Sequence, residues 1–75
     1  MGIAKESLRD RDVFFDYDFE EALFRFDHRA KTFFCKLYGQ PSEVEIPHDD
    51  RLVNEALRFG EEVSEALYRA GKPRR

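Results

Sequence analysis

The chain has 75 residues, a net charge of −3 and one cysteine, Cys35. A chain of this length forms a single domain with a small core, and one cysteine excludes an internal disulfide and a cysteine-rich zinc site. No apolar run approaches the roughly 20 residues of a membrane helix, and residues 1–12 are too charged for a secretion signal. Together these features predict a soluble protein of the cytoplasm.

Charge and apolar periodicity divide the chain into three parts. Residues 1–12 are charged and have no apolar face, which predicts a flexible N-terminal arm. Residues 13–71 carry the regular apolar patterns and are expected to form one domain. Residues 72–75 contain three basic and no acidic side chains, so we expect a basic C-terminal tail.

The pattern after residue 12 is typical of strands. Phe15, Tyr17 and Phe19 alternate with acidic residues, as on a strand that is buried on one face. Residues 32–38 are rich in side chains that favour strands. Turns at residues 28–31 and 39–42 would then join these segments into an antiparallel meander.

The two turns fix the expected register of the meander. Apolar side chains then lie opposite apolar ones, and basic ones opposite acidic ones. The predicted cross-strand pairs are Phe26–Phe33, Arg25–Phe34, Lys36–Glu45 and Leu37–Val44. One face of the sheet would carry Phe24, Phe26, Phe33, Cys35, Leu37, Val44 and Ile46.

The same segment also permits a helix. Apolar residues between Phe19 and Leu37 form a stripe at helical spacing, Asp18 and Glu21 have the spacing of a capping box, and Gly39 would end the helix. An all-α helical hairpin is therefore the alternative fold.

Residues 49–71 predict one long amphipathic helix. Its apolar residues fall on one side of the helical wheel. Asp49 or Asp50 would cap its first turn, and Gly71 followed by Pro73 would end it. The opposite side would carry the i,i+4 ion pairs Arg51–Glu55, Arg58–Glu62 and Glu65–Arg69.

Gly60 lies in the middle of this predicted helix, where a glycine costs ~1 kcal/mol relative to alanine. Close approach of another element would explain it. The predicted fold is α+β: a small antiparallel meander of three to four strands, with one C-terminal amphipathic helix packed on one face.

The residues suited to chemistry do not form a known motif. His28 and His48 each lie beside acidic residues, but their spacing matches no metal site. Cys35 is expected to face the core as a small apolar side chain. The sequence has no glycine-rich phosphate loop, so we predict no enzyme activity, no metal and no cofactor.

The surplus of aromatic residues predicts a protein-binding surface. Eight Phe and three Tyr exceed what one helix covers on a single sheet face. We expect a homodimer that also presents this aromatic surface to another protein. The predicted partner-binding residues are Phe14, Phe34, Tyr38 and Phe59.

The aromatic surface could instead be covered in either of two ways. The N-terminal arm could fold over the aromatic face. Alternatively, bases of a nucleic acid could stack on it, although Glu43 and Glu45 on the same face oppose this. The nucleic-acid interface would comprise Arg25, Lys36, Lys72, Arg74 and Arg75.

Overall fold

Five antiparallel strands form one sheet in the spatial order β4-β3-β2-β1-β5. The computed structural model describes residue 3 and residues 7–74. The strands are β1 (Val13–Tyr17), β2 (Ala22–Asp27), β3 (Thr32–Leu37), β4 (Val44–Ile46) and β5 (Glu61–Val63). The helices are α1 (Ser7–Asp10), α2 (Arg51–Phe59) and α3 (Glu65–Ala70), and a 3-10 turn, η1 (Asp18–Glu20), follows β1.

The α+β fold is confirmed, and the all-α hairpin is wrong. Strands β1 to β4 are consecutive neighbours, as a meander requires, and β5 adds a fifth strand beside β1. The turn between β2 and β3 lies at residues 28–31. Its register places Phe26 opposite Phe33 and Arg25 opposite Phe34, as predicted.

The predicted register of β3 with β4 is wrong by two residues. Glu45 lies opposite Phe34 rather than Lys36, and Val44 lies opposite Cys35 rather than Leu37. The Tyr38 amide donates a hydrogen bond to the Glu21 carbonyl at 2.9 Å, which extends the pairing of β3 with β2 beyond Leu37. The connection between β3 and β4 is therefore longer than the predicted four-residue turn. A shift of two residues leaves each side chain on the predicted face of the sheet. Leu37 and Val44 nevertheless lie outside the core, where they are 50% and 64% exposed.

The single C-terminal helix is also wrong, because it breaks at Gly60. This residue is extended (φ −78°, ψ 176°), and the chain continues as β5 along the edge of β1. A Cβ atom at Gly60 would lie 2.5 Å from the Ala56 carbonyl oxygen and 2.8 Å from that of Asp16. Close approach therefore explains the glycine, as expected, but the approach is to a strand and the end of a helix.

Side-chain caps mark the starts of α2 and α3, the two helices that replace the predicted long helix. The Asp50 carboxylate accepts a hydrogen bond from the Leu52 amide at 2.8 Å, and the Ser64 hydroxyl accepts one from the Leu67 amide at 3.1 Å. The expected ion pairs Arg51–Glu55 and Glu65–Arg69 form. The Arg58–Glu62 pair is replaced by a contact between Arg11 and Glu62 at 2.5 Å, because Glu62 now lies on β5.

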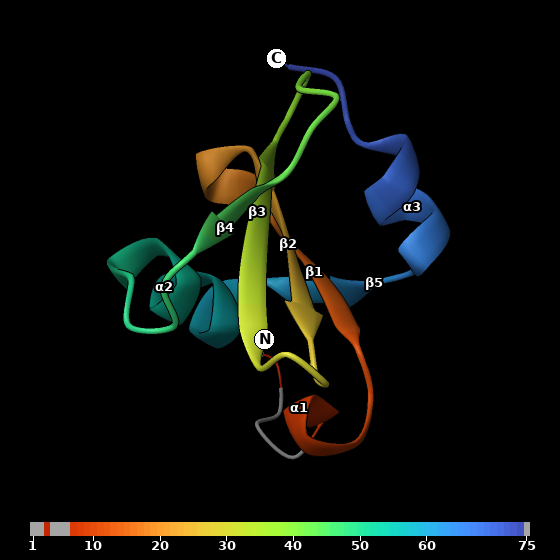
Figure 1. Ribbon diagram of the computed structural model, residues 1–75. Coiled ribbons are helices and arrows are strands. Elements are labelled where there is room, and N and C mark those ends of the chain that lie inside the picture. The colour runs from red at the N-terminus through yellow and green to blue at the C-terminus, as the bar shows by residue number, and fades with distance from the viewer. Residues whose placement is uncertain (1–2, 4–6, 75) are drawn as a thin grey trace.

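Because the predicted helix is interrupted at Gly60, α2 and α3 lie on opposite faces of the sheet (Figure 1). Val53 and Ala56 of α2 pack on the face that carries Phe15 and Phe24. Tyr68 of α3 packs on the opposite face. That second cluster comprises Phe14, Leu23, Tyr38 and Tyr68, with Val63 and Leu67 at its margin.

The described part of the N-terminal segment packs on the fold rather than forming a free arm. Ile3 is 8% exposed, and its amide donates to the Leu57 carbonyl at 2.7 Å. Residues 7–10 form α1, and Leu8 packs against the core on the α2 side. For residues 1–2 and 4–6, the expected arm lies outside the described residues.

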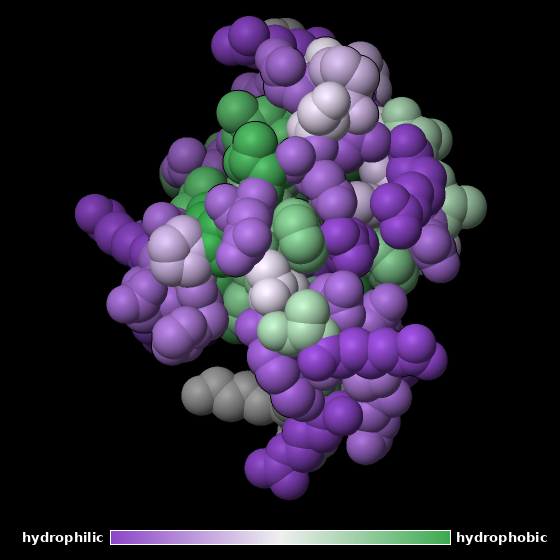
Figure 2. Space-filling model, viewed as in Figure 1, coloured by the Kyte–Doolittle hydropathy of each residue, from purple (hydrophilic) through white to green (hydrophobic). Residues whose placement is uncertain are grey.

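Within the described residues, no helix is long and apolar enough to cross a membrane. Hydrophilic side chains cover most of the face seen in Figure 2, and hydrophobic ones reach the surface in small patches.

Candidate partner-binding site

The structure separates the four predicted partner-binding residues. Phe14 and Tyr38 are buried, 9% and 3% exposed, so the expectation that they face outward is wrong. The physical reason is α3, whose Tyr68 ring lies 5.4 Å from that of Phe14. Phe34 is half-buried under the Arg25 guanidinium, at 4.1 Å, and Phe59 remains 58% exposed.

Arg25 is engaged within the molecule. Its guanidinium donates two hydrogen bonds to the Glu43 carboxylate, at 3.1 and 2.6 Å, and so holds the pKa of Glu43 below its usual range. The Tyr68 hydroxyl donates to the same carboxylate at 2.5 Å. This network ties β2, the β3–β4 connection and α3 together.

Two of the other basic residues proposed for nucleic acid, Lys36 and Lys72, bond to groups of the same molecule. The Lys36 ammonium donates to the carbonyls of Tyr68 and Arg69, at 3.1 and 2.9 Å, near the end of α3. Lys72 pairs with Asp16 at 2.5 Å. Arg74 runs past Gly39, and Arg75 lies outside the described residues.

A hollow on the surface lies where β1 passes into η1. It has a volume of about 620 Å³. Strand β5 pairs with β1 only at Phe14, Phe15 and Asp16, so the hollow opens beyond the last pair. We call it the η1 groove, and it is lined by Asp16, Tyr17, Asp18, Phe19, Phe59, Glu61 and Lys72.

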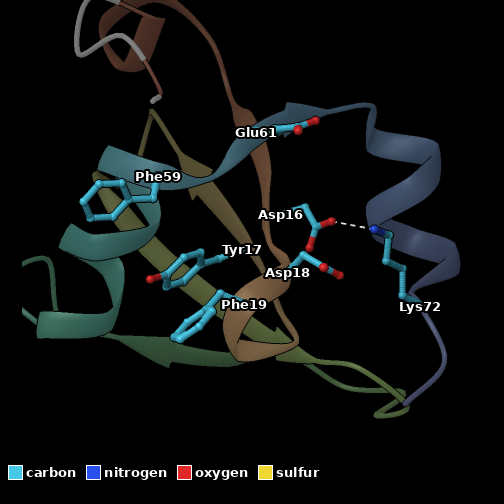
Figure 3. A pocket seen from close by; sticks show the side chains of 7 residues that line it. All are labelled: Asp16, Tyr17, Asp18, Phe19, Phe59, Glu61 and Lys72. Atoms are coloured by element: carbon cyan, nitrogen blue, oxygen red, sulfur yellow. Dashed lines mark hydrogen bonds and ion pairs between the residues drawn. The ribbon is translucent and has the colours of Figure 1, made fainter. Parts of the chain in front are cut away.

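The η1 groove has an aromatic side and an acidic side (Figure 3). Tyr17, Phe19 and Phe59 gather on one side, and the rings of Tyr17 and Phe19 lie 6.1 Å apart. The carboxylates of Asp16, Asp18 and Glu61 lie on the other, with Lys72 beyond them. The arrangement combines apolar contact area with negative charge.

Buried hydrogen bonds hold the acidic side in place. The Tyr38 hydroxyl donates to Asp16 at 2.5 Å and contacts Asp18 at 3.0 Å. Burial of this hydroxyl, followed by its bonds to the two carboxylates, raises the pKa of Tyr38. Tyr38 therefore stays protonated and positions both carboxylates.

The backbone of η1 presents Phe19 to solvent. Glu21 takes a left-handed conformation (φ 51°), and its amide donates to the Asp18 carbonyl at 3.0 Å. The turn so formed leaves the Phe19 side chain 82% exposed, although its backbone is anchored. An exposed phenylalanine on an anchored turn is typical of a contact residue.

Phe19 is an exposed aromatic residue that the sequence did not predict as part of the partner-binding surface. Its alternation with acidic residues placed it on a strand, or on the stripe of a helix, with its side chain in the core. Neither pattern signals that the strand ends at Tyr17, because the turn depends on a left-handed conformation at Glu21, a residue type that seldom adopts it.

His28 and Cys35 have surroundings typical of structural residues. His28 Nδ1 lies 2.7 Å from the Asp12 carboxylate, whose pKa is lowered by this contact. Burial raises the pKa of Cys35 to about 11, so its thiol stays protonated at neutral pH. Residue 3 and residues 7–74 contain no group of three His, Cys, Asp or Glu side chains that could hold a metal ion.

Comparison with known proteins gives a consistent result. The chain is 43% identical over 76 residues to the immune protein Tis1 of Pseudomonas aeruginosa (strain UCBPP-PA14), covering 99% of each chain. It also resembles a chain in the crystal structure of the complex between the type VI effector Tas1 and its immunity protein. That match has a TM-score of 0.92 and 42% identity, and covers 97% of this chain and 99% of the other. The family of the Tis1 immunity protein matches residues 1–72, and the chain belongs to this family.

Proposed function

We propose that this chain is a non-enzymatic immunity protein, which binds a type VI effector resembling Tas1 and thereby neutralises it. One observation carries the proposal. The fold matches, at a TM-score of 0.92 over 97% of the chain, a chain from the complex of Tas1 with its immunity protein. At 42% identity, such a match supports a common mode of action through protein–protein contact.

The surface chemistry supports a protein partner over a nucleic acid. The basic side chains Arg25, Lys36 and Lys72 bond to groups of the same molecule. The chain carries a net charge of −3, and three carboxylates line the η1 groove. A phosphate backbone would be repelled by such a surface, whereas a basic protein surface would be attracted.

Co-expression tests the proposal. Bacterial cells producing Tas1 should grow when they also produce this chain, with the immune protein Tis1 as the positive control. The purified chain and Tas1 should elute together from a sizing column at about 10 µM, a concentration at which interactions of micromolar affinity are visible. Neutralisation by Tis1 without any neutralisation or complex formation by this chain would contradict the proposal.

Two expectations from the sequence stay predictions. The homodimer is tested by sedimentation of the pure chain. The cytoplasmic location is tested by fractionation of cells that produce the chain from its own gene.

A further inference from the structure

We propose, resting on the proposed function, that the η1 groove is the docking site for a basic segment of the effector. An arginine or lysine of that segment lies against Phe19 and Phe59 and pairs with the carboxylates of Asp18 and Glu61. The occupant is thus a cationic stretch of protein rather than a small molecule or a second copy of this chain.

Aromatic exposure is the first observation. Phe19 and Phe59 are 82% and 58% exposed, and both line the same groove. Leu37 and Val44 are also exposed, but neither lines this groove. Phenylalanine rings beside a hollow supply large apolar area at small cost in side-chain entropy, which is the usual character of an energetic centre in an interface.

Charge complementarity is the second observation. The groove is lined by three carboxylates and one ammonium, and that ammonium, of Lys72, is paired with Asp16. A second hollow, of about 300 Å³, borders η1 at Glu20; Asp50, Glu55 and Arg51 also line it, and Arg51 pairs with Glu55. Acidic side chains outnumber basic ones in both hollows, so the field would accelerate the approach of a cationic segment.

The chain itself contains one example of the contact that we propose for the partner, a cation that stacks on an aromatic ring and pairs with a carboxylate. The Arg25 guanidinium lies 4.1 Å above the Phe34 ring and donates to a carboxylate of Glu43 at 2.6 Å. A guanidinium satisfies both interactions at once, because its face stacks on a ring while its edge donates to oxygen. The η1 groove offers the same two elements, a ring and a carboxylate, on its facing sides.

The groove is also organised before binding. Tyr38 holds Asp16 and Asp18, and the Tyr38 amide donates to the Glu21 carbonyl at the end of η1. Asp16 and Asp18 therefore need little ordering when a partner arrives, which favours tight association.

Binding of Tas1 to immobilised variants tests the inference. The groove variants are Phe19→Ser and Glu61→Lys. The matched controls are Val44→Ser, an exposed apolar residue on β4, and Glu45→Lys, an exposed acidic residue on the same strand. All four positions are exposed, so we expect each variant to keep the circular dichroism spectrum and melting temperature of the unchanged chain.

Each groove variant should bind Tas1 at least about tenfold more weakly, and each control within about twofold of the unchanged chain. Raising the salt from roughly 50 to 500 mM should weaken binding of the unchanged chain more than binding of Glu61→Lys, because the carboxylate contact is screened.

Three results would overturn the inference in distinguishable ways. If the unchanged chain binds Tas1 and the groove variants bind equally well, the groove is not the docking site and the proposed function stands. If the unchanged chain does not bind Tas1 while Tis1 does, the proposed function fails. If Phe19→Ser converts a dimer into a monomer without changing the affinity for Tas1, a second copy of the chain occupies the groove.

Discussion

The Tyr68 hydroxyl donates a hydrogen bond to the Glu43 carboxylate at 2.5 Å, which joins α3 to the connection before β4. Tyr68 is 1% exposed, and its ring fills the second hydrophobic cluster. The packed ring and this bond together explain how a helix of six residues, too short to be stable by itself, is held on the sheet.

Tyr68→Phe should lower the free energy of unfolding by ~1 kcal/mol, because it removes one buried hydrogen bond while the ring remains. Tyr68→Ala should cost ~3 to 5 kcal/mol, because it also leaves a cavity. Urea denaturation measures both values. Equal losses for the two variants would contradict the packing described for the ring.

Gly60→Ala distinguishes the observed break from a continuous helix. Alanine in a helix would stabilise the protein by ~1 kcal/mol relative to glycine. Here the added Cβ would lie 2.5 and 2.8 Å from two backbone oxygens, so we expect destabilisation by at least ~1 kcal/mol. The sign of the change in melting temperature decides between the two structures.

Lys36→Met should loosen α3. The substitution keeps much of the apolar stem but removes the ammonium that donates to the carbonyls of Tyr68 and Arg69. We expect a loss of ~1 to 3 kcal/mol and faster amide hydrogen exchange at Leu67 and Tyr68. Lys31→Met, at an exposed turn position, is the control and should change stability by less than ~0.5 kcal/mol.

The Arg25–Glu43 contact predicts a loss of stability in acid. Because hydrogen bonding to Arg25 lowers the pKa of Glu43 in the folded state, this carboxylate stabilises the protein above its unfolded-state pKa, near ~4.3. The contribution disappears as the pH falls through the lower, folded-state pKa.

Chemical denaturation between pH 7 and pH 3 measures this dependence. The unfolding free energy of the unchanged chain should decrease below about pH 4.3, and Glu43→Gln should reduce the slope. A slope that is the same in both proteins would assign the acid sensitivity to other carboxylates, such as Asp12 and Glu62, whose pKa values are also lowered.

The sequence predicted those features that depend on neighbouring strands or single turns. The pairing of Phe26 with Phe33 follows from side-chain complementarity across one four-residue turn. The Asp50 cap follows from the residue type at the start of a helix. Both are local, so a single sequence contains the information.

The features that sequence analysis missed depend on distant contacts. Residues 49–71 have continuous helical periodicity, but the edge of β1 offers backbone hydrogen bonds that divide the segment at Gly60. Because α3 then reaches the opposite face, it covers Phe14 and Tyr38, which the single-helix interpretation had left exposed. The exposed position of Phe19 has a local cause instead, because the left-handed conformation of Glu21 closes the η1 turn after Tyr17.

The order of elements along the chain has a consequence for synthesis. Strands β1 to β4 end at Ile46, whereas the helices that cover the two faces of the sheet belong to residues 51–70. During translation the meander therefore emerges first, with apolar side chains uncovered on both sides, and it is sealed only when the last third of the chain leaves the ribosome. A nascent chain that stalls before Gly60 would display the Phe14 and Leu23 side to the cell, so prompt completion of translation protects this protein from aggregation.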